Sequence, residues 1–404
     1  MPVRTAPANL SADDAQLRAE YVREVLALLY PSPHDDATTS TEYVLVPDAR
    51  RPRILVPAAD RKVAAAAVAR YAEPQSRLAR LKRDAVVAAL RTGAASALLR
   101  DRVTAPGGRD TIETHLRDAL GMDVRLGVHI GPARANRKPV LQVLTPAGET
   151  VAFVKLGVNE LTRGLVKAEA AGLVTLSGAA IDGVAVPKLL HSGQWREHEV
   201  LVQAALPVWE PRVPADRARC AAAMHAVATA CGISSGTLGG SGYWARLLAR
   251  LADVADHPDG FQLGRAAARL GTAAGDVRLT FGAWHGDWAP WNMRPVADRI
   301  LVWDWERFTI GVPLGYDAVH HDLQQRISAQ SDGADAVRQT LAAAPGLLAP
   351  FGVTTPAAVR VTALLYLVDL AARYLTDRQA EAGARLGVLG SWLLPVLLST
   401  VEDL

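Results

Sequence analysis

Three side chains with oxygen atoms follow one another closely in the segment 281–306. Asp287 closes a His-Gly-Asp triplet, Asn292 stands five residues further on, and Asp304 follows after another twelve. Carboxylate and amide oxygens are the ligands that Mg²⁺ prefers, and a carboxylate can also accept the proton of a hydroxyl group. Residues of these types, if they converge, indicate a magnesium-dependent phosphoryl-transfer site.

The chain between Asn292 and Asp304 has the pattern of a β-hairpin. Two apolar runs flank a turn at Ala297–Arg299, which is centred on Asp298. A hairpin with this centre places Asn292 and Asp304 opposite each other on neighbouring strands. Asp287 enters from the short loop before the hairpin, so the three side chains are expected to meet.

Two residues further upstream fit the same chemistry. Lys155 lies in the strand-like run Val151–Leu156, in a chain with 6 lysines and 38 arginines (44 Lys and Arg less 6 Lys). A compact ammonium group on a strand suits nucleotide phosphates, although a solvent-facing strand lysine is the simpler alternative. Glu169, on a helix predicted from Glu160, is the candidate partner of Lys155. Glu160 is an alternative partner, and Glu169 would then be a solvated helix carboxylate.

Other side chains of the chain are weaker candidates. His320, His321 and Asp322 resemble a metal-ligand set, but neighbouring side chains on a helix point apart, so they are not expected to share one ion. The tryptophans that crowd the segment 281–306 are interpreted mainly as packing residues. Trp288 and Trp291 are the two that we consider as lining of a pocket.

Length and composition favour an ordinary globular protein. The 404 residues are enough for two or three domains, 50% are hydrophobic, and a net charge of +3 is too small to imply a nucleic-acid partner. The N-terminus lacks the apolar segment of a signal peptide, and the apolar stretch 386–401 is too interrupted to predict a membrane span. We therefore expect a cytoplasmic protein, in a compartment with ATP and magnesium.

Two compositional features leave alternatives open. Cys220 and Cys231 are the only cysteines, and we expect both to be reduced and buried in an Ala-rich helix.

Residues 50–109 carry 14 Lys and Arg against 4 Asp and Glu. This excess indicates either a basic surface for an anionic partner or, more simply, solvated helix faces in an arginine-rich chain. A nucleic-acid-binding function ranks last, because aromatic residues do not interleave with the basic ones.

Hydrophobic periodicity and turn residues predict a mixture of helices and strands. The first 120 residues are predicted to form helices near 11–29, 60–73, 76–99 and 110–120, and a hairpin over 42–57. The next part is predicted to form strands over 124–131, 138–145, 151–157, 185–192 and 198–204, a helix over 160–177 and a turn at Gly193-Gln194. Beyond residue 207 the chain is predicted to be mainly helical, with helices near 214–231, 241–255, 261–274, 315–329, 333–344, 356–380 and 383–402.

The ordered set of residues resembles the aminoglycoside phosphotransferase and choline kinase group of small-molecule kinases. The likeness rests on the His-Gly-Asp triplet followed by Asn292, on Trp303-Asp304-Trp305-Glu306, and on the later run from Pro313 to Asp317. It covers about residues 121–380.

The resemblance implies an α+β, two-lobed protein-kinase-like fold. A small antiparallel-sheet N-lobe would span 121–206, a helical C-lobe with the catalytic loop would span 207–404, and residues 1–120 would form an extra α/β subdomain. The repeated glycines of the protein-kinase phosphate loop are absent. A distinctive activation segment between Asp304 and Asp317 is also absent, which argues against a protein substrate.

The resemblance also implies a role for each candidate residue. ATP would lie between the lobes and Mg²⁺ would bridge its phosphate oxygens. The implied roles are adenine contacts for the hinge residues Gln203 and Ala205, phosphate contacts for Lys155 with its partner Glu169, magnesium binding for Asn292 and Asp304, the base for Asp287, a brace for His285 and possible assistance to the metal from Glu306.

The expected function is ATP- and magnesium-dependent transfer of the γ-phosphoryl group to a hydroxyl of a small molecule, such as an aminoglycoside, an amino sugar or another sugar-like acceptor. Acidic residues are scattered, so the residues do not select a polycation as substrate. The alternative is a catalytically inactive kinase-like module that binds a nucleotide or a partner protein. Neither a nucleic-acid nor a membrane partner is expected.

Overall fold

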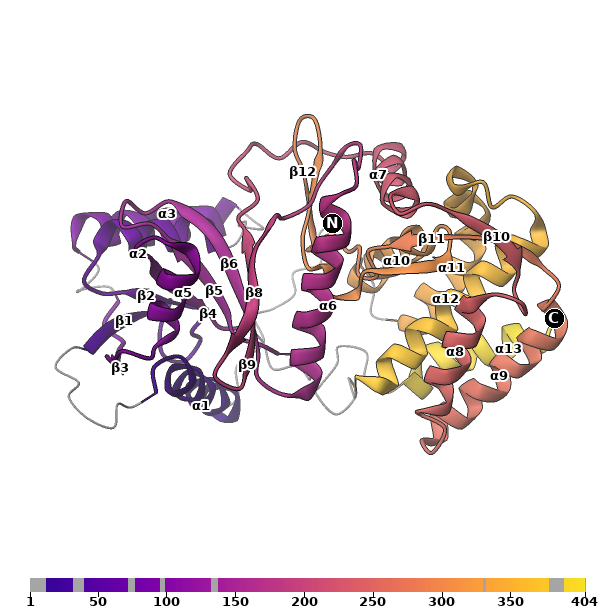
Figure 1. Ribbon diagram of the computed structural model, residues 1–404, viewed down its shortest axis with the longest axis horizontal. Helices are drawn as coiled ribbons and strands as arrows, with labels where there is room; N and C mark the ends of the chain where they lie inside the picture. Colours follow the sequence, from indigo (N-terminus) through magenta and orange to yellow (C-terminus); the bar gives the residue numbers. More distant parts are fainter. Residues whose placement is uncertain are drawn as a thin grey trace. The chain divides into compact units, whose positions relative to one another are not determined.

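The chain forms two compact units, shown in the computed structural model of Figure 1. The structure describes residues 12–31, 40–71, 77–94, 99–131, 137–329, 332–377 and 389–403. The first unit comprises Met1–Pro132, Lys138–Arg163 and Leu189–Ala205, and the second comprises Ala133–Arg137, Gly164–Lys188 and Leu206–Leu404. The chain leaves the first unit for the last time after Ala205.

An antiparallel sheet of eight strands is the frame of the first unit. In spatial order the strands are β3 (Arg102–Pro106), β1 (Ser40–Val46), β2 (Ile54–Pro57), β4 (Arg125–His129), β5 (Val140–Leu144), β6 (Thr150–Gly157), β9 (His198–Ala204) and β8 (Leu189–Trp195). The predicted α+β class with an antiparallel sheet is confirmed. The sheet contains strands from both sides of residue 120, since β1, β2 and β3 precede it and the other five strands follow it.

Both faces of this sheet carry an apolar core, because successive side chains of a strand point to opposite faces. Tyr43 and Leu45 belong to the core on one face, and Val44 and Val46 belong to the core on the other. The first core is completed by α1 (Ala12–Leu29) and α5 (Ile112–Leu120), and the second by α2 (Arg61–Tyr71) and α3 (Arg77–Thr92).

The connection from β6 to α6 (Glu160–Ser177) follows local rules. Asn159 caps the helix as predicted, with its Oδ1 accepting a hydrogen bond from the Thr162 N–H at 2.9 Å. Gly157 precedes the cap, and a Cβ at this position would lie 2.5 Å from the Arg163 Cα. The strand can therefore turn into the helix only with glycine at 157.

Three features of the first unit differ from the prediction. Helix α3 ends at Thr92, whereas the helix was predicted to continue to residue 99. Strand β3 was not predicted, because it has only five residues, of which one is buried, and lies at the edge of the sheet. The turn between β8 and β9 lies at Arg196-Glu197 and not at Gly193-Gln194, since Trp195 pairs with His198. Arg196 supplies the positive φ, +54°, that this turn needs.

The second unit is mainly helical, as predicted. Its helices after α6 are α7 (Arg217–Thr229), α8 (Gly242–Ala252), α9 (Pro258–Ala274), α10 (Tyr316–Ala329), α11 (Gly333–Leu348), α12 (Pro356–Thr376) and α13 (Leu393–Glu402). Residues 378–388, which include the end of the predicted helix 356–380 and the start of the predicted helix 383–402, lie outside the described part. Two small sheets were only partly predicted: β10 (Ser234–Thr237), β11 (Arg278–Trp284) and β14 (Thr309–Pro313) form one, and β12 (Met293–Pro295), β13 (Ile300–Val302) and β7 (Val184–Ala185) form the other.

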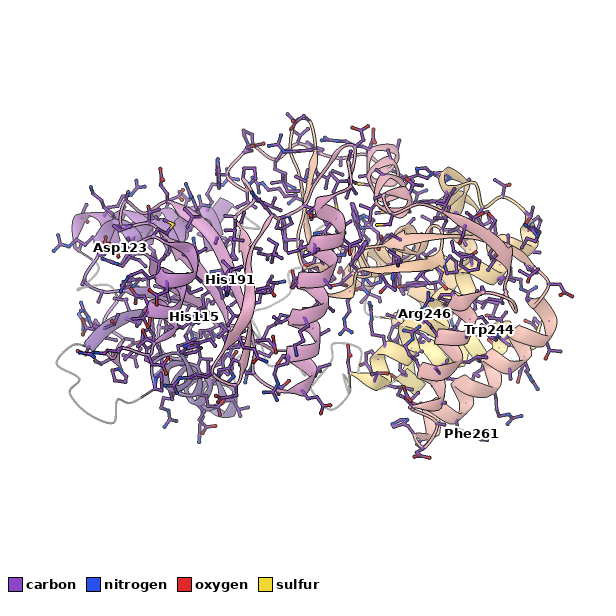
Figure 2. All side chains as sticks on the ribbon, viewed as in Figure 1. His115, Asp123, His191, Trp244, Arg246 and Phe261 are labelled. Carbon is purple, nitrogen blue, oxygen red and sulfur yellow. The ribbon has the colours of Figure 1, made fainter. Side chains whose placement is uncertain are left out.

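Helix α8 fixes the strand that follows Asp304. The guanidinium of Arg246, a residue labelled in Figure 2, donates hydrogen bonds to the carbonyl oxygens of Ile310, at 3.3 Å, and Gly311, at 2.9 Å, both in β14. Because β14 also pairs with β11, the ends of both strands are held at one place in the fold.

The predicted hairpin is present, but its register differs by one residue. Met293 pairs with Val302, and the Trp303 N–H donates to the Asn292 carbonyl oxygen at 3.1 Å. Asn292 therefore lies opposite Trp303, and the prediction that it faces Asp304 is wrong. The reason is the turn, which contains two residues and not three, since the Val296 N–H donates to the Arg299 carbonyl oxygen.

Two further expectations concern membranes and cysteines. Within the described ranges, no single helix is long and apolar enough to cross a bilayer, although the bent pair Gly333–Phe351 and Pro356–Thr376 passes by length and composition together. Cys220 and Cys231 are free thiols, as expected. Cys231 is exposed, so its predicted burial is wrong; it follows the end of α7, whereas Cys220 lies within the helix and is half-buried.

Candidate active site

The Asp287 loop, defined here as residues 285–287, leaves the end of β11 beside the start of β14. Trp284, the last residue of β11, pairs with Thr309, the first residue of β14. The hairpin β12–β13 and the turn of 3₁₀ helix Trp305–Arg307 lie between these two strands in the sequence. The topology therefore returns the chain after Asp304 to the place where the Asp287 loop begins.

Helix α10 satisfies the backbone of this loop. The Asp317 carboxylate accepts hydrogen bonds from the N–H groups of His285, at 2.7 Å, and Gly286, at 3.1 Å. Burial raises the pKa of Asp317 to about 7, although the two N–H groups act in the opposite direction. The Asp317 carboxylate thus accepts the hydrogen bonds of two buried N–H groups, which a neighbouring strand would accept if β11 continued.

Helix α12 and the hairpin satisfy the carbonyl groups of the loop. Arg373 donates to the Gly286 carbonyl oxygen, and Asn292 donates from Nδ2 to the Asp287 carbonyl oxygen at 2.9 Å. The Asp287 N–H donates to His285 Nδ1 at 3.1 Å. The polar backbone groups of the loop are thus held by three different elements, which fixes the position of Asp287.

Gly286 is required by conformation and by space. Its φ is +84°, and a Cβ would lie 2.4 Å from the Arg307 carbonyl oxygen. A side chain at this position would push against backbone, which cannot rotate away. The glycine of the His-Gly-Asp triplet therefore allows the Asp287 loop to pack against the segment after Asp304.

The carboxylate of Asp287 receives one hydrogen bond on each oxygen. His320 Nε2 lies 3.0 Å from Oδ1, and Asn292 Nδ2 lies 2.8 Å from Oδ2. Burial by itself raises the pKa of Asp287, but His320 and the Arg373 charge outweigh it, so the pKa is below its usual range. The side chain remains 31% exposed, so an ionised carboxylate is accessible to a hydroxyl group.

His285 joins this loop to the hairpin. Its Nε2 lies 3.0 Å from the Trp303 carbonyl oxygen, which makes Nε2 the donor and leaves Nδ1 to accept from the Asp287 N–H. Burial lowers the pKa of His285 to about 4, and its side chain is fully buried. A neutral ring between two backbone groups fits a brace and not an acid or base.

A trio of carboxylates, Glu169, Asp304 and Glu306, lies where the chain leaves strand β13. One oxygen of each lies within 4.8 Å of one oxygen of each of the others. Glu169 is fully buried and also accepts a hydrogen bond from the Trp305 N–H at 3.2 Å. Such a set of hard oxygen ligands fits a divalent cation such as Mg²⁺.

The backbone of Asp304 explains how this residue joins the trio. Its φ of +71° and ψ of +55° are in the left-handed region, which is unusual for a residue other than glycine. The turn at Asp304 ends β13 and starts the 3₁₀ helix, so that Asp304 and Glu306 come together. Glu169, predicted as a lysine partner, is thereby placed among the candidate metal ligands, and Glu306 joins them.

The remaining predicted residues belong to the first unit. Lys155 lies in β6 between Val140 of β5 and Leu201 of β9, and its side chain is 7% exposed, which contradicts the alternative of a solvent-facing strand lysine. Gln203 is buried in β9, and the N–H of Ala205 donates to the Val151 carbonyl oxygen at 3.0 Å. The pairing of Lys155 with Glu169 stays a prediction.

Sequence reasoning missed Tyr366 and Arg373, and it considered His320 only as a weak candidate metal ligand. His320, Tyr366 and Arg373 contact the Asp287 loop or one another, and only the three-residue spacing from Asp317 to His320 marks a shared helix face. Trp288 does not line a pocket: it is fully buried, with its Nε1 3.2 Å from the Met293 Sδ. Trp291, by contrast, is 51% exposed.

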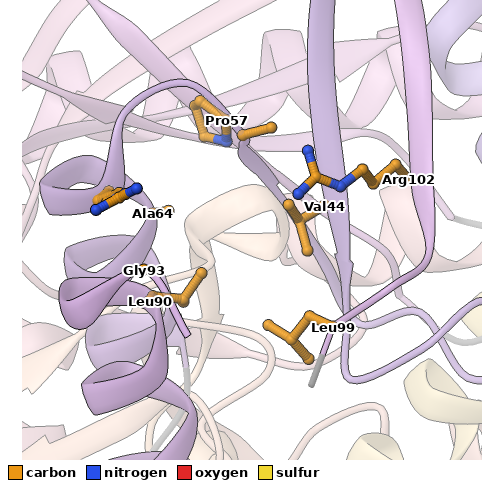
Figure 3. A pocket seen from close by; sticks show the side chains of 9 residues that line it. Val44, Pro57, Ala64, Leu90, Gly93, Leu99 and Arg102 are labelled. Carbon is orange, nitrogen blue, oxygen red and sulfur yellow. The ribbon is translucent and has the colours of Figure 1, made fainter. Parts of the chain in front are cut away.

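A small cavity of about 130 Å³ lies wholly within the first unit (Figure 3). It has an apolar floor that includes Val44, Leu90 and Leu99. Arg102 at its edge is paired with Glu42 at 2.5 Å. The volume is well below the roughly 300 Å³ at which small-molecule pockets begin, so we assign no nucleotide to it.

Comparison with solved structures finds proteins of the kind that the motifs resemble. A thermostable mutant of aminoglycoside phosphotransferase APH(4)-Ia, in a ternary complex with ADP and hygromycin B, is 17% identical over 72% of this chain and 98% of its own, with a TM-score of 0.47. A glucosamine kinase is 17% identical over 75% of this chain and 88% of its own, with a TM-score of 0.35.

A choline/ethanolamine kinase family protein from Mesorhizobium loti is 16% identical over 68% of this chain and 93% of its own, with a TM-score of 0.37. These are small-molecule kinases. No protein-family model and no curated protein sequence matches the chain.

Proposed function

We propose that the chain is a small-molecule kinase that transfers the γ-phosphoryl group of ATP to a hydroxyl group. The observation that carries this proposal is the placement of His285. Its ring accepts from the N–H of Asp287 and donates to the carbonyl oxygen of Trp303, the residue before Asp304. One buried side chain thus couples the candidate base to the candidate metal ligand, and phosphoryl transfer requires both in a fixed relation.

Asp287 would orient the acceptor hydroxyl. As the bond between the acceptor oxygen and the γ-phosphorus forms, the bond from that phosphorus to the β,γ-bridging oxygen breaks and ADP leaves. The proton of the hydroxyl passes to the Asp287 carboxylate, which is ionised and partly exposed. Because the transition state is loose, this carboxylate contributes more by positioning than by base strength.

A divalent cation would be held by the oxygens of Asp304 and Glu306, with Glu169 beside them and the Asn292 side-chain oxygen as a further candidate. The donor set fits Mg²⁺, since it contains carboxylates and an amide and no soft ligand. When bound, the cation neutralises charge on the phosphates. In its absence the trio concentrates negative charge in a partly buried place.

Residues of the first unit are proposed to bind the nucleotide. Lys155 would contact the phosphates, because a compact ammonium group on a strand suits the phosphate oxygens of a nucleotide. Gln203 and Ala205 would contact the adenine. Since the N–H of Ala205 is already used by Val151, its carbonyl oxygen is the group that we expect to meet the adenine amino group.

The acceptor is proposed to be a sugar-like alcohol, such as an aminoglycoside, an amino sugar or a simple sugar. A panel of these alcohols should be incubated with MgATP, with release of ADP as the readout. We expect at least one acceptor to raise ADP release above the rate with water, and Asp287→Asn to abolish the increase. Asp298→Asn, in the exposed turn of the hairpin, is the matched control.

Two outcomes would count against the proposal. Full turnover by Asp287→Asn would show that Asp287 is not the base. Binding of MgATP by the wild type without transfer to any acceptor or to water would support the alternative of an inactive nucleotide-binding module.

A further inference from the structure

His320 is a buried ionisable side chain for which the proposed reaction has no step. It lies on α10, three residues after Asp317, and its side chain is fully buried. Its Nε2 is 3.0 Å from Asp287 Oδ1, and its Nδ1 is 2.9 Å from the Tyr366 hydroxyl. The ring therefore connects α12 to the carboxylate of the candidate base.

The two contacts of the ring define its tautomer. An ionised Asp287 can only accept, so Nε2 donates, and Nδ1 is left to accept from the Tyr366 hydroxyl. Burial lowers the pKa of His320 although Asp287 acts to raise it, and burial raises the pKa of Tyr366. A neutral ring and a neutral phenol are consistent with this arrangement near pH 7.

The carboxylate of Asp287 is held at two points. Its terminal torsion is intrinsically broad, so the carboxylate of a partly exposed Asp can rotate. His320 fixes Oδ1 from α10, and Asn292 fixes Oδ2 from the hairpin. Because each oxygen accepts a hydrogen bond from a different element, the carboxylate cannot rotate freely, and its remaining lone pairs face solvent in one fixed direction.

The neighbouring histidine does not share this arrangement. His321 Nδ1 lies 3.2 Å from the Trp288 carbonyl oxygen, and its Nε2 lies 2.8 Å from Gln325 Nε2. Asp322, the next residue, pairs with Arg326. The contact with Asp287 is thus specific to His320 and does not follow from a cluster of polar residues on α10.

We propose that His320 is a positioning residue of the phosphoryl-transfer site, whose Nε2–H, oriented by Tyr366, holds Asp287 in the rotamer that receives the acceptor hydroxyl. This inference rests on the proposed function. Loss of orientation of a reacting group lowers kcat, whereas nucleotide binding does not depend on the Asp287 rotamer. His320 acts through Asp287 and does not itself touch the substrate.

The kinetic test compares His320→Leu with His320→Gln. His320→Leu removes the donor, and we expect kcat for ADP release with the best acceptor of the panel to fall about 10- to 100-fold. The KM for MgATP should stay within about twofold of the wild-type value. His320→Gln keeps an N–H near the position of Nε2 and should recover most of the lost kcat. His225→Leu, a histidine of α7 that contacts Phe351, is the control.

A merely structural role would give a different pattern. If His320→Leu is folded and keeps the wild-type kcat, or if His320→Gln is as impaired as His320→Leu, the positioning role is refuted. If His320→Leu does not fold, Tyr366→Phe replaces it, since this change keeps the ring and removes only the hydroxyl. We expect Tyr366→Phe to lower kcat about three- to tenfold, and an unchanged kcat in this variant would overturn the role of the tautomer.

A spectroscopic measurement separates this inference from the proposed function. In ¹⁵N-histidine NMR spectra of the wild-type protein, His320 should carry its proton on Nε2, and Asp287→Asn should shift that resonance. A proton on Nδ1 would refute the positioning arrangement whether or not the protein transfers phosphate. The expected tautomer together with an inert enzyme would refute the proposed function and, with it, the positioning role of His320.

Discussion

Neutralising Glu306 should stabilise the protein when divalent cations are absent. The oxygens of Glu169, Asp304 and Glu306 lie within 4.8 Å of one another, and Glu306 is only 7% exposed. At an effective dielectric constant of about 20, two unit charges at this distance repel by about 3.5 kcal/mol. Hydrogen bonds to the carboxylates and the partial exposure of Asp304 reduce the net value, so we expect Glu306→Gln to raise the free energy of unfolding by about 1–3 kcal/mol.

With magnesium present, the wild type should be more stable than Glu306→Gln. A cation that binds only the folded state adds about 2.7 kcal/mol of stability at a concentration of 100 times its Kd. The wild type should gain more from MgCl₂ than Glu306→Gln gains, because the variant has lost a ligand. Urea denaturation with EDTA and with MgCl₂ measures both effects. Glu197→Gln, at a 70% exposed side chain of the first unit, is the charge control.

The result that would refute this reasoning is a loss of stability in Glu306→Gln of equal size with EDTA and with MgCl₂. Glu306 would then be a structural hydrogen-bond acceptor and not a member of a cation site. An equal gain in stability from MgCl₂ in the two proteins would separate Glu306 from the metal even if the charge repulsion were real.

Three further predictions concern the frame of the site and the first unit. Gly286→Ala should lower the free energy of unfolding by at least about 3 kcal/mol, because it combines backbone strain of about 1–2 kcal/mol with a clash against Arg307. Urea titrations measure the effect. Gly352→Ala is the control, since Gly352 also has a positive φ but faces open space, and it should show the backbone strain alone. Asp317→Ala should cost about 1–3 kcal/mol for each of the two N–H groups that it leaves buried, measured in the same way; a loss below 1 kcal/mol would contradict its role. Burial lowers the pKa of His129 to about 4, so the folded state resists protonation and the free energy of unfolding falls as the pH drops from about 6.5 to about 4. In His129→Leu, about 2 kcal/mol of the stability that the wild type loses between pH 7 and pH 5 should be retained. An unchanged pH dependence in this variant would contradict the lowered pKa of His129.

The sequence predicted best what is decided locally. Helix 160–177 with its Asn159 cap was correct to the residue, because a cap, a helical period and a preceding strand are all readable within a short window. The hairpin after Asn292 was also predictable. Its register was wrong by one residue, since the choice between a two-residue and a three-residue turn depends on backbone geometry that the residue types at 297–299 do not fix.

The contacts that hold Asp287 were beyond sequence reasoning. His320 is 33 residues from Asp287, and Arg373 is 87 residues from Gly286. These pairs meet only after α10 and α12 have packed against the end of β11, and no local period reveals that packing. The same limit applies to Glu169, which the motif order assigned to Lys155 alone and which the fold also places beside Asp304.

Binding of magnesium and a non-hydrolysable ATP analogue, measured by calorimetry, tests the central claim most directly. If Asp287 acts on the acceptor and Asp304 acts on the metal, Asp287→Asn should bind the magnesium nucleotide within about threefold of the wild type, whereas Asp304→Ala should lose the magnesium-dependent part of binding. Asp304→Ala with unchanged binding in magnesium, or Asp287→Asn with binding abolished, would contradict this division of roles.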